Sequence, residues 1–77
     1  AAKDESYTPA LYYLAYGLAA DGRLNESLPL FEKAIQLNPY DYITFKLRAE
    51  TYENIKLTKE ASADYKKALE LLLKIQN

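Results

Sequence analysis

The feature that most limits how this chain can fold is an internal repeat with a period of 34 residues. A shift by this period aligns small residues with small ones and large residues with large ones. The matched pairs are Leu11 with Phe45, Ala15 with Ala49, Leu18 with Tyr52, Ser27 with Ala61, Phe31 with Tyr65, Ala34 with Ala68, and Leu37 with Leu71. A fixed period of this length is typical of proteins that stack copies of one small unit. We predict two copies, residues 8–41 and 42–77, after a flexible N-terminal segment of residues 1–7.

Each copy contains two stretches with the apolar spacing of an amphipathic helix, and local start and stop signals separate them. These signals are Thr8 as an N-cap followed by Pro9, Asp21-Gly22 as a stop, Asn25 as the second N-cap, the "LNPYD" stretch as the next stop, Asp41 as the third N-cap, and a last helix from about Thr58. Pro29 falls early in the second helix, where it costs one hydrogen bond. The chain is therefore predicted to be all-α, with four antiparallel helices in two tandem helix-turn-helix hairpins and an extended last helix.

The matched residues are predicted to form the core of each hairpin. Small side chains let two helices approach closely, and large ones fill the space around them. In the first helix the predicted inward stripe is Leu11, Leu14, Ala15 and Leu18. In the last helix it is Ala61, Tyr65, Ala68, Leu71, Leu72 and Ile75.

Composition excludes several classes of function. The 77 residues are 49% hydrophobic and 27% charged with a net charge of −1, which fits a folded chain without a basic surface for nucleic acid. Cysteine and histidine are absent, and no nucleophile with a base or phosphate-binding glycine loop is present. Glu50 and Glu53 lie one turn apart on what reads as a solvated helix face. We predict no enzyme activity, no catalytic or metal site and no cofactor.

A membrane role is also not expected. The uncharged stretch Thr8 to Ala20 has 13 residues, whereas a helix needs about 20 to cross a bilayer. The sequence does not identify the compartment, and a cytoplasmic location is the working expectation. Because the chain begins with Ala1, a processed product or an excised fragment of a longer repeat protein is one interpretation.

The period, the small residues at the eighth, twentieth and twenty-seventh positions of each copy, and the closing "LNP" resemble the tetratricopeptide repeat. The stretches "AIQLNP" and "KKALEL" are similar to its second helix. The departures are Leu11 where the family usually has Trp, Ser27 for Ala, Lys56 for Gly in the second turn, and "ELLL" where the second copy would read Asp-Pro. The resemblance implies a fragment of a right-handed α-solenoid, in which the first helix of each pair lines a concave groove for a peptide.

By this resemblance the groove residues would come from the first helix of each copy. They are Tyr12, Tyr13, Tyr16 and Ala20 from the first copy, and Lys46, Leu47, Glu50 and Asn54 from the second. Tyrosine combines a large rigid ring with a polar tip and is enriched at interfaces. The resemblance therefore predicts a protein-interaction module, adaptor or scaffold whose partner offers apolar or aromatic anchors. The alternative is that one or two of these tyrosines pack as core with their hydroxyls in water.

A subset of the family binds the carboxylate at the end of a chaperone tail, and "FKLRAETY" is similar to a stretch of those proteins. The positions that hold the carboxylate there correspond to Tyr12, Tyr16 and Leu47 here. A carboxylate needs charged or amide donors at about 3 Å, which these side chains do not provide. We therefore predict peptide binding without a carboxylate clamp. By analogy of fold, chaperone-like binding of apolar segments is a related interpretation.

The last helix suggests a rival function. It carries more apolar residues than one inward stripe needs, and terminal repeats usually need a polar cap. Self-association, for example as a homodimer, would use Leu69, Leu72, Leu73 and Ile75.

Overall fold

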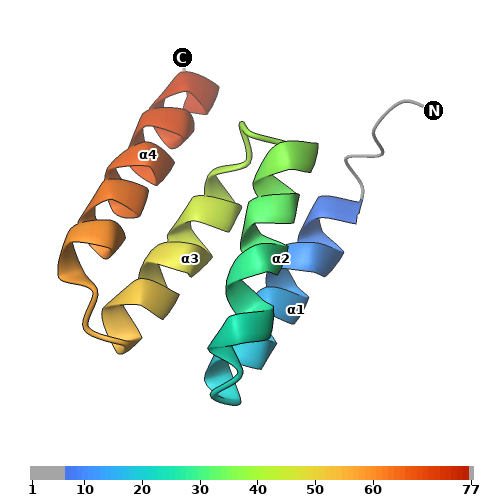
Figure 1. Ribbon diagram of the computed structural model, residues 1–77. Helices are drawn as coiled ribbons and strands as arrows, with labels where there is room; N and C mark the ends of the chain where they lie inside the picture. Colours follow the sequence, from blue (N-terminus) through green and yellow to red (C-terminus); the bar gives the residue numbers. More distant parts are fainter. Residues whose placement is uncertain (1–6, 77) are drawn as a thin grey trace. The chain divides into compact units, whose positions relative to one another are not determined.

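The computed structural model describes residues 7–76 of the chain. Four α-helices follow one another: α1 (Thr8–Ala20), α2 (Leu24–Leu37), α3 (Tyr42–Asn54) and α4 (Thr58–Gln76) (Figure 1). No strand occurs in this part of the chain, so the predicted all-α class is confirmed. Apart from Tyr7, the predicted flexible segment 1–7 lies outside the described residues.

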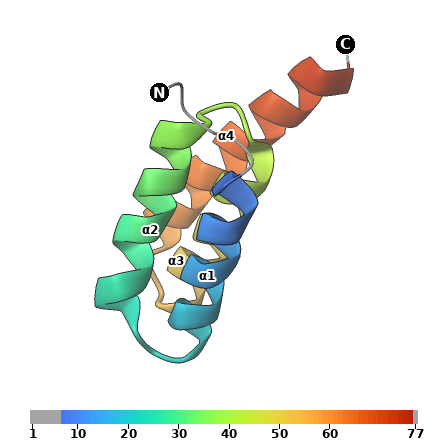
Figure 2. The same ribbon diagram turned by 90° about the vertical axis from the view of Figure 1, so that its right-hand side faces the viewer.

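The chain divides into two compact units, one ending at Pro39 and the other beginning at Tyr40. In hairpin 1, α1 and α2 lie side by side, and in hairpin 2, α3 and α4 lie side by side (Figure 2). Each unit is thus one antiparallel helical hairpin, and each is described by itself below.

The turn of hairpin 1 is set by a glycine. Gly22 has a φ of 82°, in the left-handed region that a residue without Cβ enters at little cost. The Arg23 N–H donates to the Leu18 carbonyl at 2.8 Å, and the Gly22 N–H donates to the Ala19 carbonyl at 3.0 Å. This pair of hydrogen bonds is the Schellman arrangement that ends many helices. The Asp21-Gly22 stop is confirmed.

The turn of hairpin 2 has the same hydrogen bonds but no glycine. The Leu57 N–H donates to the Tyr52 carbonyl at 2.9 Å, and the Lys56 N–H donates to the Glu53 carbonyl at 3.1 Å. Lys56 occupies the left-handed position with a φ of 70°, where a side chain crowds the backbone. This is the position at which the sequence departs from the family's glycine.

Two of the predicted N-caps are wrong by one or two residues. The N-cap of α1 is Tyr7 rather than Thr8, and that of α2 is Arg23 rather than Asn25; neither side chain bonds the helix end. Thr8 is instead the first residue of α1 and is buried. Arg23 makes two hydrogen bonds to the Glu26 carboxylate, the shorter of 2.6 Å. Thr8 and Asn25 cannot be N-caps because each already lies inside its helix.

The other boundaries follow the local signals. The residue before Pro39 is extended, with Asn38 at φ −147° and ψ 92°, so α2 ends at Leu37. The Asp41 carboxylate accepts a hydrogen bond from the Ile43 N–H at 3.1 Å and caps α3 as predicted. Pro29 lies inside α2.

The core of hairpin 1 forms where small residues meet. The Ser27 hydroxyl donates to the Ala15 carbonyl at 2.7 Å, which joins α2 to α1, and both residues are fully buried. Phe31 and Ala34 complete the buried part of α2 as predicted. On α1 the buried residues are Thr8, Tyr12 and Ala15, whereas Leu14 is 54% exposed. The predicted stripe through Leu14 is therefore wrong.

The core of hairpin 2 contains an ion pair that the sequence analysis missed. The Arg48 guanidinium donates to both carboxylate oxygens of Asp64, at 2.7 and 2.9 Å, and both side chains are mostly buried. The same guanidinium lies 5.7 Å from the ring centre of Phe45 and 5.6 Å from that of Tyr52. Around this pair the predicted Ala49, Ala61, Ala68 and Leu71 are buried.

Two members of the predicted inward stripe of α4 are exposed. Tyr65 is partly exposed, and its hydroxyl donates to the Glu53 carboxylate at 2.9 Å. Ile75 is exposed near the end of α4, which at 19 residues is longer than the 13-residue α3. An antiparallel partner of 13 residues cannot cover the whole length of a 19-residue helix, so the stripe continues past its cover.

Candidate protein-binding surface

Helix α1 carries no charged side chain along its 13 residues. On one flank of the helix, about 100° around its axis from the buried residues, lie four residues that define what we call the aromatic face: Pro9, Tyr13, Tyr16 and Ala20. Tyr13 is 60% exposed, Tyr16 is half-buried, and the other two are exposed. Because tyrosine is enriched at protein interfaces, the aromatic face is a candidate contact surface.

Tyr12 differs from the other predicted groove residues. Its side chain is 3% exposed, and its ring meets the Tyr13 ring edge to face with the centres 4.8 Å apart. For this residue the structure favours the alternative that the sequence analysis left open, that of a tyrosine packed as core. Tyr12 thus supports the Tyr13 ring from beneath and offers a partner little surface of its own.

The predicted groove residues of hairpin 2 give α3 a different character. Lys46, Glu50 and Asn54 follow one another at four-residue spacing, which places them along one face of the helix. Lys46 and Asn54 are exposed and Glu50 is half-buried. Leu47 is half-buried, and its carbonyl accepts a hydrogen bond from the Thr51 hydroxyl at 3.0 Å. This row offers charges and an amide where α1 offers rings.

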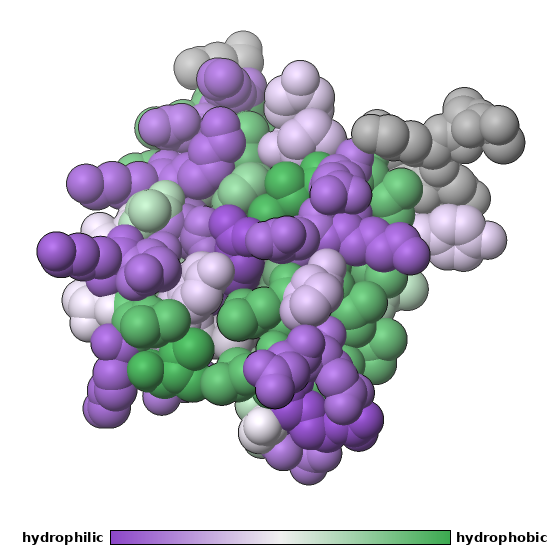
Figure 3. Space-filling model, viewed as in Figure 1, coloured by the Kyte–Doolittle hydropathy of each residue, from purple (hydrophilic) through white to green (hydrophobic). Residues whose placement is uncertain are grey.

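The predicted self-association residues lie on α4. Leu69 is 56% and Leu73 50% exposed; they are four residues apart and share one side of the helix. Leu72 is half-buried beside them, and Ile75 is exposed on the core side near the helix end. We call Leu69, Leu72 and Leu73 the leucine face. Figure 3 shows hydrophobic areas between hydrophilic ones on the face that it views.

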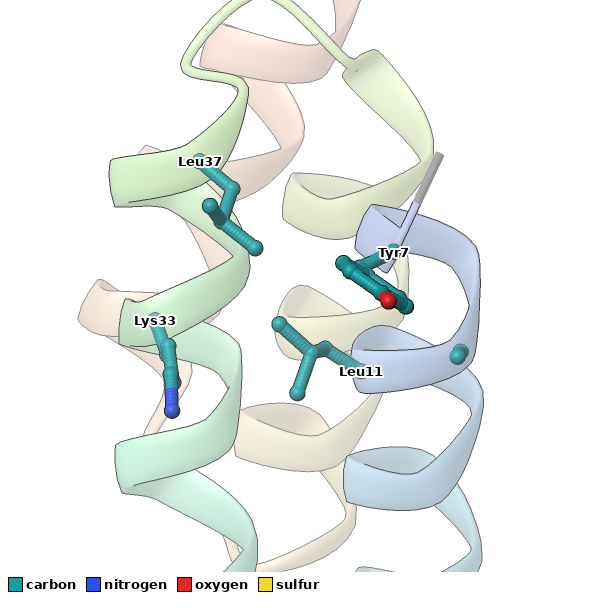
Figure 4. A pocket seen from close by; sticks show the side chains of 5 residues that line it. Tyr7, Leu11, Lys33 and Leu37 are labelled. Atoms are coloured by element: carbon teal, nitrogen blue, oxygen red, sulfur yellow. The ribbon is translucent and has the colours of Figure 1, made fainter. Parts of the chain in front are cut away.

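Hairpin 1 also contains a pocket of about 280 Å³ that the sequence analysis did not predict. It opens between the start of α1 and the end of α2 and is lined by Tyr7, Ala10, Leu11, Lys33 and Leu37. Figure 4 shows Tyr7 and Leu11 on one side of it and Lys33 and Leu37 on the other. The lining is apolar except for the Lys33 ammonium and the Tyr7 hydroxyl. The signal in the sequence was Leu11, which stands where the repeat usually has a larger aromatic residue.

No group of acidic, cysteine or histidine side chains that could hold a metal ion occurs within residues 7–76. None of the helices described for this chain has the length and apolar character needed to cross a membrane.

Comparison with known proteins supports the architecture. Sequence models described as tetratricopeptide repeat match residues 8–41 and 47–71, which together span most of the chain. A search of curated proteins and a search of solved structures gave no significant match. Repeats of this kind are generally protein–protein interaction modules. Two helical hairpins with a 34-residue period, matched once each, show that the chain belongs to the tetratricopeptide repeat family.

Proposed function

We propose that this protein is a peptide-binding module that holds a partner on the aromatic face of α1. The observation that carries the proposal is Tyr13, which is largely exposed on a helix without any charged residue. Tyrosines in such positions are frequent among residues whose truncation costs the most binding energy. Because the face lacks charge, the partner segment would contribute apolar or aromatic side chains, in an extended or helical conformation.

The contacts on hairpin 2 would be of another kind. The row of Lys46, Glu50 and Asn54 on α3 offers charged and amide side chains that pair with polar groups of a partner. Polar contacts of this sort give specificity more than affinity. We therefore assign the larger share of the binding energy to Tyr13 and Tyr16.

The burial of Tyr12 determines how the proposal is tested. Removing the Tyr12 ring would take away buried packing, so its effect on binding would be mixed with a loss of stability. The appropriate variant is Tyr13→Ala/Tyr16→Ala, and Tyr40→Ala is the matched control because Tyr40 is an exposed tyrosine outside α1. Peptides selected from a random library on the unmodified protein serve as the probe.

We expect the double variant to bind the selected peptides at least tenfold more weakly, and the control to bind them as the unmodified protein does. Isothermal titration calorimetry gives the dissociation constants, and circular dichroism checks that both variants remain helical. Equal affinity of the double variant and the unmodified protein would contradict the proposal.

The leucine face favours a second function, self-association. Exposed leucines at four-residue spacing on α4 form the pattern by which one helix packs on another. In this interpretation two copies pair through Leu69, Leu72 and Leu73, with Ile75 at the edge. Sedimentation velocity over a range of concentrations tests it: we expect Leu69→Lys/Leu73→Lys to remain a monomer where the unmodified protein dimerises. A monomer of the unmodified protein at the highest concentration would exclude this function.

A further inference from the structure

Some of the residues that line the pocket of hairpin 1 differ from those at the same positions of hairpin 2. Leu11 lines it, and the residue 34 positions later is Phe45. Phe45 is 7% exposed. Leu71, which stands 34 positions after the pocket residue Leu37, is buried as well. Leu11 and Leu37, at the same positions in hairpin 1, are only half-buried. Where hairpin 2 has a phenylalanine ring in its core, hairpin 1 has an opening.

A second difference leaves a positive charge beside this opening. Lys67 of hairpin 2 pairs with the Glu70 carboxylate one turn further on, at 4.0 Å. In hairpin 1 the corresponding residues are Lys33 and the neutral Gln36. No ion pair of Lys33 is found within the described part of the chain. An apolar pocket with an unpaired ammonium group at its side is therefore a property of hairpin 1.

We propose that this pocket binds an aromatic side chain of the partner, and that Lys33 pairs with an Asp or Glu side chain next to it. This inference rests on the proposed function, since it names the chemistry of the segment that the module recognises. The ring of the partner occupies the space that Phe45 fills in hairpin 2, between Leu11 and Leu37. The neighbouring carboxylate plays the role that Glu70 plays for Lys67.

The size of the pocket fits a single side chain. Its volume of about 280 Å³ lies just below the roughly 300–1,000 Å³ that pockets for whole small molecules occupy. The apolar lining from Ala10, Leu11 and Leu37 removes the ring from water, which supplies the affinity. The Lys33 charge adds discrimination between an acidic and a neutral neighbour.

The test uses two dipeptides that differ only in charge, acetyl-Phe-Glu-amide and acetyl-Phe-Gln-amide. Each is titrated into the full chain carrying ¹⁵N, and amide shifts of Leu11, Lys33 and Leu37 are followed by NMR. We expect both to shift these amides, with the glutamate dipeptide binding about two- to fivefold more tightly, the range for an ion pair in contact with solvent.

The repeat itself supplies the variants. Leu11→Phe introduces the residue of hairpin 2 and is expected to fill the pocket and abolish the shifts. Gln36→Glu gives Lys33 the acidic partner that Lys67 has in Glu70, and it is expected to remove the preference for the glutamate dipeptide. Lys33→Gln removes the charge itself and is expected to have the same effect. Lys67→Gln, the equivalent change in hairpin 2, is the control and leaves both affinities unchanged.

Two results would overturn the inference: the absence of shifts at these amides, or shifts that persist in Leu11→Phe. If Leu11→Phe fails to fold, Lys33→Gln decides, because a preference for glutamate that survives this change also overturns it. The outcome is separable from that of the proposed function. Tyr13→Ala/Tyr16→Ala leaves the pocket intact, so binding of the dipeptides to this variant shows that the pocket acts even where the aromatic face does not.

Discussion

Hairpin 1 and hairpin 2 follow one 34-residue plan, but they join their helices with different chemistry. In hairpin 1 a neutral hydrogen bond from the Ser27 hydroxyl to the Ala15 carbonyl joins α2 to α1. In hairpin 2 the same positions are both alanine, and the buried polar link is the ion pair of Arg48 with Asp64, with an exposed hydrogen bond from Tyr65 to Glu53 beside it. The hairpin 1 residues at the positions of that pair are Leu14 and Leu30.

The 34-residue repeat therefore determines where the small residues between the helices lie, but not which polar contact joins the helices. The small residues at the closest approach recur in both hairpins because any larger side chain would push the helices apart. The residues around them differ in type between the hairpins, as Leu14 and Leu30 differ from Arg48 and Asp64. Hairpin 1 therefore contains the glycine turn, an uncharged helix and the pocket beside Lys33, whereas hairpin 2 contains the buried ion pair.

The largest change in stability is expected for Arg48→Leu, which gives hairpin 2 the leucine that hairpin 1 has at the same position. It leaves the Asp64 carboxylate buried without its guanidinium partner, and we expect the free energy of unfolding to fall by about 3–5 kcal/mol. Urea denaturation followed by circular dichroism measures the loss. The double variant Arg48→Leu/Asp64→Leu should recover most of it, because an apolar pair replaces a buried ion pair at little cost. A single variant as stable as the unmodified protein would show that the pair is not needed.

The two turns give the next largest effects, of opposite sign. Gly22→Ala puts a Cβ at a left-handed φ and should lower the free energy of unfolding by about 1–2 kcal/mol. Lys56→Gly removes that crowding from hairpin 2 and should raise it by about 1 kcal/mol. No heavy atom lies within 4 Å of a Cβ built on Gly22, so steric contact with other residues does not confuse the comparison. Thermal unfolding that moves in the same direction for both variants would refute this account of the turns.

The helix starts differ as well, and Asp41→Ala tests this. Removing the carboxylate that accepts from the Ile43 N–H should cost about 1 kcal/mol. The N-cap residue of α1, Tyr7, makes no side-chain hydrogen bond to the helix end. Tyr7→Ala should therefore not lower the free energy of unfolding through the loss of a cap. Hydrogen exchange of the first amides of α3 and of α1 separates the two. Faster exchange at α1 in Tyr7→Ala to the same degree as at α3 in Asp41→Ala would contradict the difference.

The smallest effect is expected for Ser27→Ala, which gives hairpin 1 the residue of hairpin 2. The change deletes one buried hydrogen bond but leaves no buried donor unpaired, and we expect a loss of about 0.5–1 kcal/mol. Chemical denaturation measures it against Ala61→Ser, the reverse exchange. A loss as large as that of Arg48→Leu would mean that the hydroxyl carries more of the packing than one hydrogen bond.

The sequence alone predicted those structural features that depend on neighbouring residues or on the 34-residue spacing. The four helices, the Asp21-Gly22 and Asn38-Pro39 stops and the Asp41 cap follow from backbone conformations that individual residues prefer. The 34-residue period identified the small core residues, because only small side chains fit where two helices touch. These features are readable because each depends on a few neighbouring residues or on a repeated spacing.

Only the tertiary structure decided which side of each helix is covered. A helical wheel gives the angles between side chains but not the direction from which the next helix approaches. The approach at Ala15 turns Thr8 and Tyr12 inward and Leu14 outward, although leucine is the more hydrophobic choice for the core. In the same way, Asp64 is buried because Arg48 reaches it from α3, sixteen positions away in the chain. Burial depends on contacts between residues distant in sequence, and neither composition nor periodicity contains that information.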